Sequence, residues 1–257
     1  MGAAGAVLLP GVVLPASLAY GDLVRALGAG VETIVKDLEV YREDSPPPGY
    51  SLQAEVEGVL RAADDRGWSR FHLVGYSGGG AAALACAATN PERLLSLGLL
   101  EPAWAGDWDW SSRHEDLWAD YDALARLPHD QFMSAFMRLQ VRPGVQLPEP
   151  PSGPPPPWMK QRPAGIRALM RTFSTYELHR DALAAFDRPV YFALGGLSNP
   201  NQFGEVAERL DSVFADFTLE VFAERHHFDP PHRREPERLA ESLLRLWSRS
   251  ERLHPTE

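Results

Sequence analysis

Ser77 stands in a glycine-rich pentapeptide, Gly-Tyr-Ser-Gly-Gly, at residues 75–79. A serine hydroxyl becomes a nucleophile when a neighbouring base takes its proton, and backbone N–H groups must then hold the charge that develops on the substrate oxygen. Glycines on both sides of the serine permit a sharp turn and a close approach of neighbouring backbone. Because such a pattern also arises by chance, the pentapeptide alone is weak evidence, and its context decides whether Ser77 is predicted to be a nucleophile.

The segments on either side of the pentapeptide favour the same interpretation. An apolar run at residues 71–74 leads directly into it, and an alanine-rich segment at residues 81–89 follows. A strand, a sharp turn and a helix in this order form a nucleophile elbow, in which the N–H of Gly78 points toward the developing oxyanion. The alternative is a plain glycine-rich turn in which Ser77 only caps the helix. A phosphate-binding loop is excluded because no Gly-Lys-Ser or Gly-Lys-Thr follows.

The remainder of the chain must supply the scaffold for this turn. Apolar runs predict strands at residues 6–9, 31–38, 71–74, 94–100, 190–194 and 217–222. Helical spacing of apolar residues predicts helices at residues 20–27, 51–65, 81–89, 203–210 and 236–247. Strands that alternate with helices form a mostly parallel sheet flanked by helices, so the fold class is α/β.

The alternation is interrupted between residues 103 and 185, where no convincing buried strand is found. Helices are expected there instead, at residues 115–127, 130–141 and 163–173. A sheet that stops and later resumes predicts one core, built from residues 1–102 and 186–257. Residues 103–185 are then expected to form an inserted helical cap.

With these features the chain resembles the α/β-hydrolase superfamily over essentially its whole length, as a capped member with a serine nucleophile. The resemblance implies the α/β-hydrolase fold and a chain order of nucleophile, acid and histidine. The segment Arg-His-His-Phe-Asp at residues 225–229 follows the last predicted strand and resembles the family's histidine loop. It implies His227 as the catalytic base, with His226 as the alternative. Two histidines without a catalytic role remain the other interpretation.

The acid departs from the family pattern. The family usually places an Asp a few residues after the strand at 190–194, where this chain has Ser198 and Asn199. Some members take the acid from the end of the preceding strand, and that position is Glu101. A carboxylate there would hold the histidine tautomer. The alternatives are that Glu101 anchors the cap or pairs with an Arg, or that a Ser–His dyad works without an acid.

The loop after the first strand departs as well. The family often has His-Gly there, and this chain has Pro10 and Gly11. Proline removes one N–H donor. The resemblance implies that the useful donor comes from the next residue, Val12, so Val12 and Gly78 are expected to form the oxyanion hole.

Large apolar and aromatic residues are frequent in the predicted cap. Trp104 and Trp108 come just after the edge of the sheet and are expected to form a pocket wall. Tyr20 and Tyr76 are expected near its mouth, where their hydroxyls would donate hydrogen bonds to a substrate; the alternative is that either side chain only packs within the protein. An apolar wall of this kind favours a small to medium apolar or aromatic substrate.

Composition limits the partners. The formal net charge is −10 and Lys and Arg are not clustered, which argues against nucleic acid and anionic membranes. No apolar run is long enough to span a bilayer. The single cysteine, Cys86, excludes an intramolecular disulfide, so a reducing, cytoplasmic location is expected. No cofactor is expected, and no metal, because the spacing of His226, His227, Asp229 and His232 matches no common ligand motif.

Three functions follow from these features. The first is a serine hydrolase that cleaves an ester, a thioester or an activated C–C bond. The second is a cofactor-free lyase, cyclase or isomerase on the same fold, favoured by the substituted acid position and by Pro10. The third is a non-catalytic protein that binds a small molecule.

Overall fold

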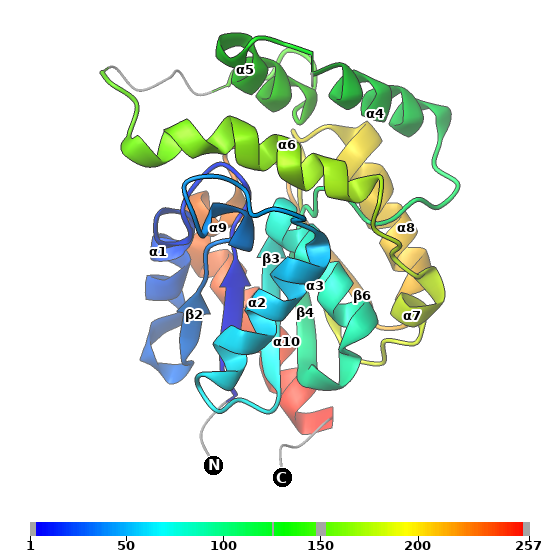
Figure 1. Ribbon diagram of the computed structural model, residues 1–257. Helices are drawn as coiled ribbons and strands as arrows, with labels where there is room; N and C mark the ends of the chain where they lie inside the picture. The colour runs from blue at the N-terminus through cyan, green and yellow to red at the C-terminus, as the bar shows by residue number, and fades with distance from the viewer. Residues whose placement is uncertain (1–3, 125, 148–152, 254–257) are drawn as a thin grey trace.

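The computed structural model describes residues 4–124, 126–147 and 153–253. Its strands form one parallel sheet in the order β2-β1-β3-β4-β5-β6 (Figure 1). The strands are β1 (Ala6–Leu9), β2 (Thr33–Val35), β3 (Phe71–Tyr76), β4 (Leu94–Leu100), β5 (Val190–Gly195) and β6 (Phe217–Phe222). Every strand predicted from the sequence is present, and the α/β fold class is confirmed.

Helices cover both faces of the sheet, as the ribbon shows (Figure 1). One face carries α1 (Ala16–Leu27), α9 (Pro231–Arg234) and α10 (Pro236–Leu253), and the other carries α2 (Leu52–Asp64), α3 (Gly78–Thr89) and α8 (Glu205–Val213). Both faces of the central strands are therefore buried, which is why β3 and β4 are apolar along almost their whole length. Within the described residues, no helix has the length and apolar character needed to cross a membrane.

Several boundaries differ from the prediction, and two of them have a cause that the structure shows. The second strand is shorter than residues 31–38, because only Thr33–Val35 pairs with β1 at the edge of the sheet. Helix α3 begins at Gly78 rather than at residue 81, because the Ser77 carbonyl accepts the N–H groups of Gly80 and Ala81. The helix N-terminus consequently lies directly at the serine.

Between β4 and β5 the described residues form helices and no strand of the sheet. These helices are α4 (Ser112–Leu124), α5 (His129–Leu139), α6 (Arg162–Phe173) and α7 (Arg180–Ala184). Figure 1 shows α4, α5 and α6 above the carboxyl ends of the strands, whereas α7 packs against α3 and α8 at the side of the sheet. Residue 125, in the helix predicted at 115–127, lies outside the described residues, as do residues 148–152.

The order of the strands places a crevice beside Ser77. The chain runs from β1 to β2 on one side and then returns to the other side of β1 to form β3. Parallel sheets bind ligands at the carboxyl ends of the strands where the order reverses in this way. Val12 follows β1 and Ser77 follows β3, so both residues lie at this reversal.

The turn between β3 and α3 requires glycine for a steric reason. A Cβ atom on Gly75 would overlap the backbone carbonyl of Gly79, which closes the turn. We predict that Gly75→Ala lowers the free energy of unfolding by about 3 kcal/mol, because backbone on both sides would have to shift. Urea denaturation measures the change. Gly30→Ala is the control, because nothing lies within 4 Å of its Cβ position. Equal stability of the two variants would contradict the assignment.

Candidate active site

Ser77 has a strained backbone that the neighbouring strand holds. Its φ of 54° lies in the left-handed region, which costs on the order of 1–3 kcal/mol for a residue other than glycine. Its N–H donates to the Leu100 carbonyl at 3.1 Å, and its carbonyl accepts the N–H of Ala103 at 2.9 Å. The turn after β3 is thereby joined to the turn after β4. The side chain is buried, with 3% of the residue exposed.

Glu101 lies in that second turn and also has a positive φ, 47°. It is 2% exposed, and its carboxylate has two partners. Oε1 accepts the N–H of Gly195, the last residue of β5, at 2.7 Å. Oε2 lies 2.9 Å from Nδ1 of His227. Glu101 therefore faces a histidine, and its partner on the β5 side is a backbone N–H group.

His227 connects Glu101 to Ser77. Its Nε2 lies 3.0 Å from Ser77 Oγ, and its Nδ1 faces the carboxylate. The Phe203 ring stacks on the imidazole at 4.3 Å with an interplanar angle of 11°, and the Tyr76 hydroxyl donates to the His227 carbonyl. The imidazole is thus held in both position and orientation.

His226, the alternative base, is not brought to Ser77. Its Nδ1 accepts the backbone N–H of Phe228 at 3.2 Å, which belongs to a tight turn within the loop. The same loop is held by Arg225, which donates to Asp229 and to Glu235, both at 2.9 Å. Of the two adjacent histidines, the structure places His227 between the hydroxyl and the carboxylate.

A hydroxyl, an imidazole and a carboxylate arranged in this order can transfer a proton from the hydroxyl to the imidazole. With Nδ1–H donated to the carboxylate, Nε2 is left as an acceptor for the serine proton. The carboxylate then stabilises the imidazolium that forms. The arrangement is suited to general acid–base chemistry at a serine nucleophile.

Val12 and Gly78 line the same small cavity as Ser77. Gly78 is the first residue of α3, where free N–H groups and the helix dipole favour negative charge. The Val12 carbonyl accepts a hydrogen bond from the Tyr41 hydroxyl at 2.8 Å, and the Arg162 guanidinium lies 3.9 Å from the Tyr41 ring centroid. The loop after β1 is therefore tied to α6 through Tyr41.

Two cavities lie near the serine. The cavity at Ser77, here called the serine chamber, has a volume of about 20 Å³. It is lined by Val12, Ser77, Gly78, Ala103, Trp118, Tyr121, Phe136, Gln140, Ile166, Leu169, Met170, Phe173 and Gln202. A second, much larger cavity of about 1010 Å³ lies among the helices between β4 and β5 and is here called the aromatic cavity.

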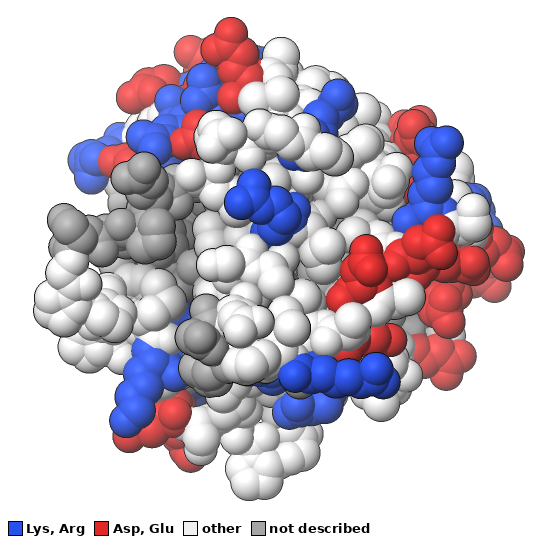
Figure 2. Space-filling model, turned by 90° about the horizontal axis from the view of Figure 1, so that it is seen from above, with Lys and Arg blue, Asp and Glu red and all other residues white. Residues whose placement is uncertain are grey.

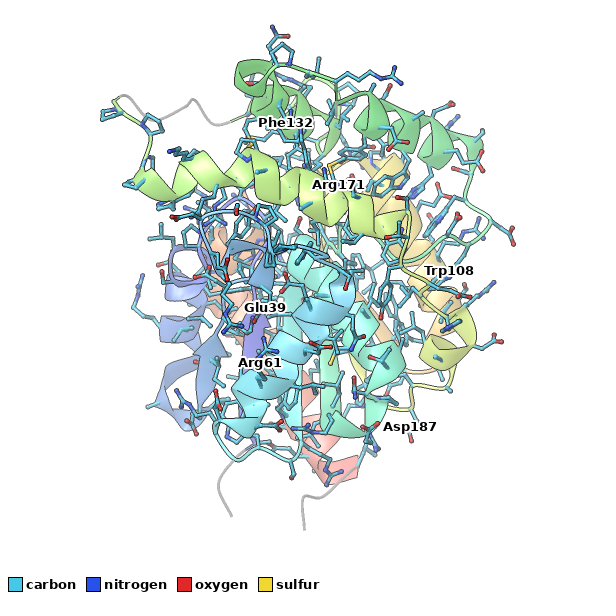
Figure 3. All side chains as sticks on the ribbon, viewed as in Figure 1. Glu39, Arg61, Trp108, Phe132, Arg171 and Asp187 are labelled. Carbon is cyan, nitrogen blue, oxygen red and sulfur yellow. The ribbon has the colours of Figure 1, made fainter. Side chains whose placement is uncertain are left out.

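Trp104 and Trp108 both line the aromatic cavity, together with Trp110, Phe132 and Arg171 among others. Figure 3 shows how far its wall extends, from Phe132 on α5 past Arg171 on α6 to Trp108. Seen from above, the middle of this end of the molecule is mostly uncharged, and acidic and basic side chains lie mainly around its margin (Figure 2).

Tyr20 and Tyr76 have other partners than those expected. Both are absent from the walls of the serine chamber and the aromatic cavity as described. The Tyr20 hydroxyl donates to the Leu9 carbonyl at 2.7 Å, and Tyr76 donates to His227. Both hydroxyls are thus used by backbone carbonyls, and Tyr20 belongs to the buried core on the α1 face. Tyr76 is a support for the histidine rather than a contact for a ligand.

Several residues at the site gave no signal in the sequence. Phe203, Gln202 and Tyr121 come from segments far apart in the chain, and the Tyr121 hydroxyl donates to Gln202 Oε1 at 2.7 Å. Gln140 lines the serine chamber and donates through Nε2 to the Phe136 carbonyl at 3.0 Å. Gln140 directly follows α5 and is buried, but neither its burial nor its partner can be identified without the fold.

Comparison with known proteins gives a family match over most of the chain. The Alpha/beta hydrolase family matches residues 6–242. A stretch of 75 residues is 36% identical to a protein described as a probable chemoreceptor glutamine deamidase CheD of Symbiobacterium thermophilum, covering 29% of this chain and 46% of that protein. The chain spans less than half of the length of the curated relatives that it matches.

Solved structures match over nearly the whole chain. A carboxylesterase of the ammonia-oxidizing thaumarchaeon Nitrososphaera gargenis has a TM-score of 0.72 at 16% identity. The match covers 98% of this chain and 93% of the carboxylesterase chain. An esterase from Exiguobacterium antarcticum has a TM-score of 0.69 at 17% identity. The match covers 96% of this chain and 93% of the esterase chain. At these identities the likeness establishes the fold.

The Tyr76 ring also contacts a second buried histidine, His232, at a centroid distance of 4.6 Å. Neither ring nitrogen of His232 has a hydrogen-bond partner within the described part of the chain. Burial lowers the pKa of His232 to about 3. In the unfolded chain this histidine has an ordinary pKa near 6.5 and binds a proton below that pH. In the folded state it stays neutral. His232 therefore reduces stability as the pH falls below about 6.5.

We predict that His232→Phe, which keeps the ring packing, removes about 2 kcal/mol of the stability loss between pH 7 and pH 5. Urea denaturation at the two pH values measures the difference. His179→Phe, at a histidine whose side chain is 65% exposed, is the control for replacing an imidazole by a phenyl ring. An unaltered pH dependence in His232→Phe would show that His232 does not titrate as a buried neutral group.

Proposed function

The chain belongs to the alpha/beta hydrolase family, and on that basis we propose that it is a serine hydrolase with Ser77 as its nucleophile. One observation carries the proposal. Ser77 Oγ, the two ring nitrogens of His227 and the Glu101 carboxylate form a continuous buried chain with separations of 3.0 and 2.9 Å. These are hydrogen-bond distances for groups that exchange a proton.

In the proposed reaction Ser77 Oγ attacks the carbonyl carbon of an ester or thioester while His227 Nε2 takes its proton. The imidazolium then gives that proton to the departing alcohol or thiol, and an acyl-enzyme remains. A water molecule, deprotonated by His227, attacks the acyl carbon. The acid is released as the acyl–Oγ bond breaks and the imidazolium returns its proton to Ser77 Oγ. Glu101 holds Nδ1–H throughout and stabilises the imidazolium.

The oxyanion of each tetrahedral intermediate would be held by the N–H groups of Val12 and Gly78. Both residues line the serine chamber, and both lie at the carboxyl ends of adjacent strands. Removing one donor from such a hole typically costs about 100- to 1000-fold in turnover, so the loop after β1 matters for rate. Pro10 precedes this loop, and its carbonyl accepts the N–H of Gly79.

The proposed substrate has an apolar or aromatic group of small to medium size. Trp104 and Trp108 would form part of the wall that binds it, since both line the aromatic cavity. An ester is the first substrate to test, because two of the structural neighbours are an esterase and a carboxylesterase.

A non-hydrolytic enzyme was the main alternative, because the expected acid after β5 is replaced by Ser198 and Asn199. The position of Glu101 beside His227 removes that reason. A protein that only binds a small molecule would not need the strained turns at Ser77 and Glu101, each of which costs stability. Pro10, the other reason for a non-hydrolytic enzyme, removes only the N–H of residue 10 and leaves that of Val12.

We predict that a fluorophosphonate probe labels the wild-type protein at Ser77 and does not label Ser77→Ala, and that hydrolysis of short-chain p-nitrophenyl esters falls at least about 1000-fold in that variant. The physical reason is the loss of the oxygen that forms the acyl bond. Intact mass spectrometry and release of p-nitrophenol are the measurements. Ester hydrolysis that survives Ser77→Ala would overturn the proposal.

Glu101→Gln should lower kcat by about 100- to 10,000-fold, because an amide N–H facing Nδ1 forces the proton onto Nε2, which then cannot accept from Ser77. Asn199→Ala is the control at the position where the family usually has its acid. Asn199 donates to the Leu139 carbonyl and accepts from Asn201, so its loss is structural and should cost less than about tenfold. Equal, mild losses in the two variants would indicate a Ser–His dyad.

A further inference from the structure

The serine chamber is too small for a substrate. Its volume of about 20 Å³ is enough for roughly one water molecule. The acetyl group of the smallest ester already needs more space than this. If Ser77 attacks an ester, the wall of the chamber must therefore open.

The aromatic cavity has room for the substrate but does not reach Ser77. Its volume of about 1010 Å³ is at the upper end of the range for ligand pockets, and Ser77 is not among its wall residues. Four side chains line both cavities and are here called the partition. They are Trp118 and Tyr121 from α4 and Met170 and Phe173 from α6. The partition therefore lies between the space that fits a ligand and the cavity at the serine.

The α4 half of the partition is held by hydrogen bonds. Trp118 Nε1 donates to His114 Nε2 at 2.8 Å, and the other ring nitrogen of His114 faces the Asn201 carbonyl at 2.8 Å. The Tyr121 hydroxyl donates to Gln202 Oε1 at 2.7 Å. Asn201 and Gln202 both belong to the segment before α8, so both side chains are fastened to the core of the molecule. Moving either one would break a buried hydrogen bond.

The α6 half has no polar anchor. Phe173, the last residue of α6, is buried in the apolar core and stacks on Trp104 at 5.2 Å and edge-on to Trp118 at 5.8 Å. Each aromatic contact of this kind contributes about 0.5–1.5 kcal/mol beyond burial. Met170, beside it, has a flexible thioether chain. Phe173 is consequently the bulky side chain of the partition that moves at the lowest cost.

We propose that the aromatic cavity binds the apolar portion of an uncharged, elongated ester, and that Phe173 is the specificity-determining residue that must be displaced for the ester carbonyl to reach Ser77. This inference rests on the proposed function. Four Trp and two Phe side chains line the cavity among charged residues of both signs, so the wall offers aromatic faces to an alkyl or aryl group and no large excess of one charge that would select an anion or a cation. Trp108 and Arg171 mark two sides of its wall in Figure 3.

Two sulfonyl fluorides of different length test the route. Methanesulfonyl fluoride and hexadecanesulfonyl fluoride share one reactive group, and in both Ser77 Oγ would bond to sulfur as fluoride leaves and His227 takes the proton. The measurement is the second-order rate constant for inactivation, with the adduct on Ser77 verified by mass spectrometry. Phe173→Ala should raise the rate constant for the long reagent about tenfold relative to that for the short one, because the long chain must lie across the partition in place of the whole phenyl ring, whereas the short reagent passes after a smaller displacement that costs fewer ring contacts.

Phe136→Ala is the matched control. Phe136 lines the serine chamber but not the aromatic cavity, and its 6% exposure is close to the 7% of Phe173. The same atoms are removed, yet the chamber is enlarged without opening the partition, so the ratio of the two rate constants should change less than about twofold. Phe173→Leu, which keeps most of the packing, should give a smaller increase than Phe173→Ala and serves if the alanine variant does not fold.

The binding part of the inference has its own measurement. Trp108 lies outside the partition, so Trp108→Ala should weaken the reversible affinity for the long reagent at least about fivefold more than that for the short one, through lost apolar contact. Equal acceleration by Phe173→Ala and Phe136→Ala, or none by Phe173→Ala and Phe173→Leu, overturns the route. Failure of both reagents and of p-nitrophenyl acetate to react with the wild-type protein overturns the nucleophile assignment itself.

Discussion

Two hydrogen bonds between the turn after β3 and the turn after β4 fix the geometry of the site. The Ser77 N–H donates to the Leu100 carbonyl, and the Ala103 N–H donates to the Ser77 carbonyl. Ser77 and Glu101 both have a positive φ, and neither conformation is favourable for an isolated residue. Because the two turns bond to each other at the buried centre of the sheet, the strain in each is offset by the same contacts.

The family pattern suggests that the segment after β5 supplies the acid, whereas in this chain the end of β5 supplies a backbone N–H group. It supplies the Gly195 N–H to Glu101 Oε1, which turns Oε2 toward His227. The segment that follows places Phe203 on the imidazole and Gln202 on Tyr121. The chain after β5 thus supports the histidine and fastens α4, while the carboxylate comes from β4.

The helices over the carboxyl ends of the strands separate the serine from the large cavity. Trp118 and Tyr121 are held by hydrogen bonds to polar groups, whereas Phe173 and Met170 are held by packing. This contrast in anchoring gives the partition one fixed side and one movable side. Ser77 is buried in this arrangement, and burial strengthens the electrostatic interactions within the site.

The sequence by itself determined the strands, most helices and the position of Ser77, because apolar runs and a glycine turn are local signals. Glu101 and His227 could be named as candidates, yet three alternatives for the acid stayed open, since nothing local says which side chains meet. Tyr20 and Tyr76 were expected at the pocket, but the direction of each side chain depends on which face of the sheet its neighbours occupy. Only the tertiary structure decided these points, together with the partition, because they depend on contacts between residues far apart in the chain.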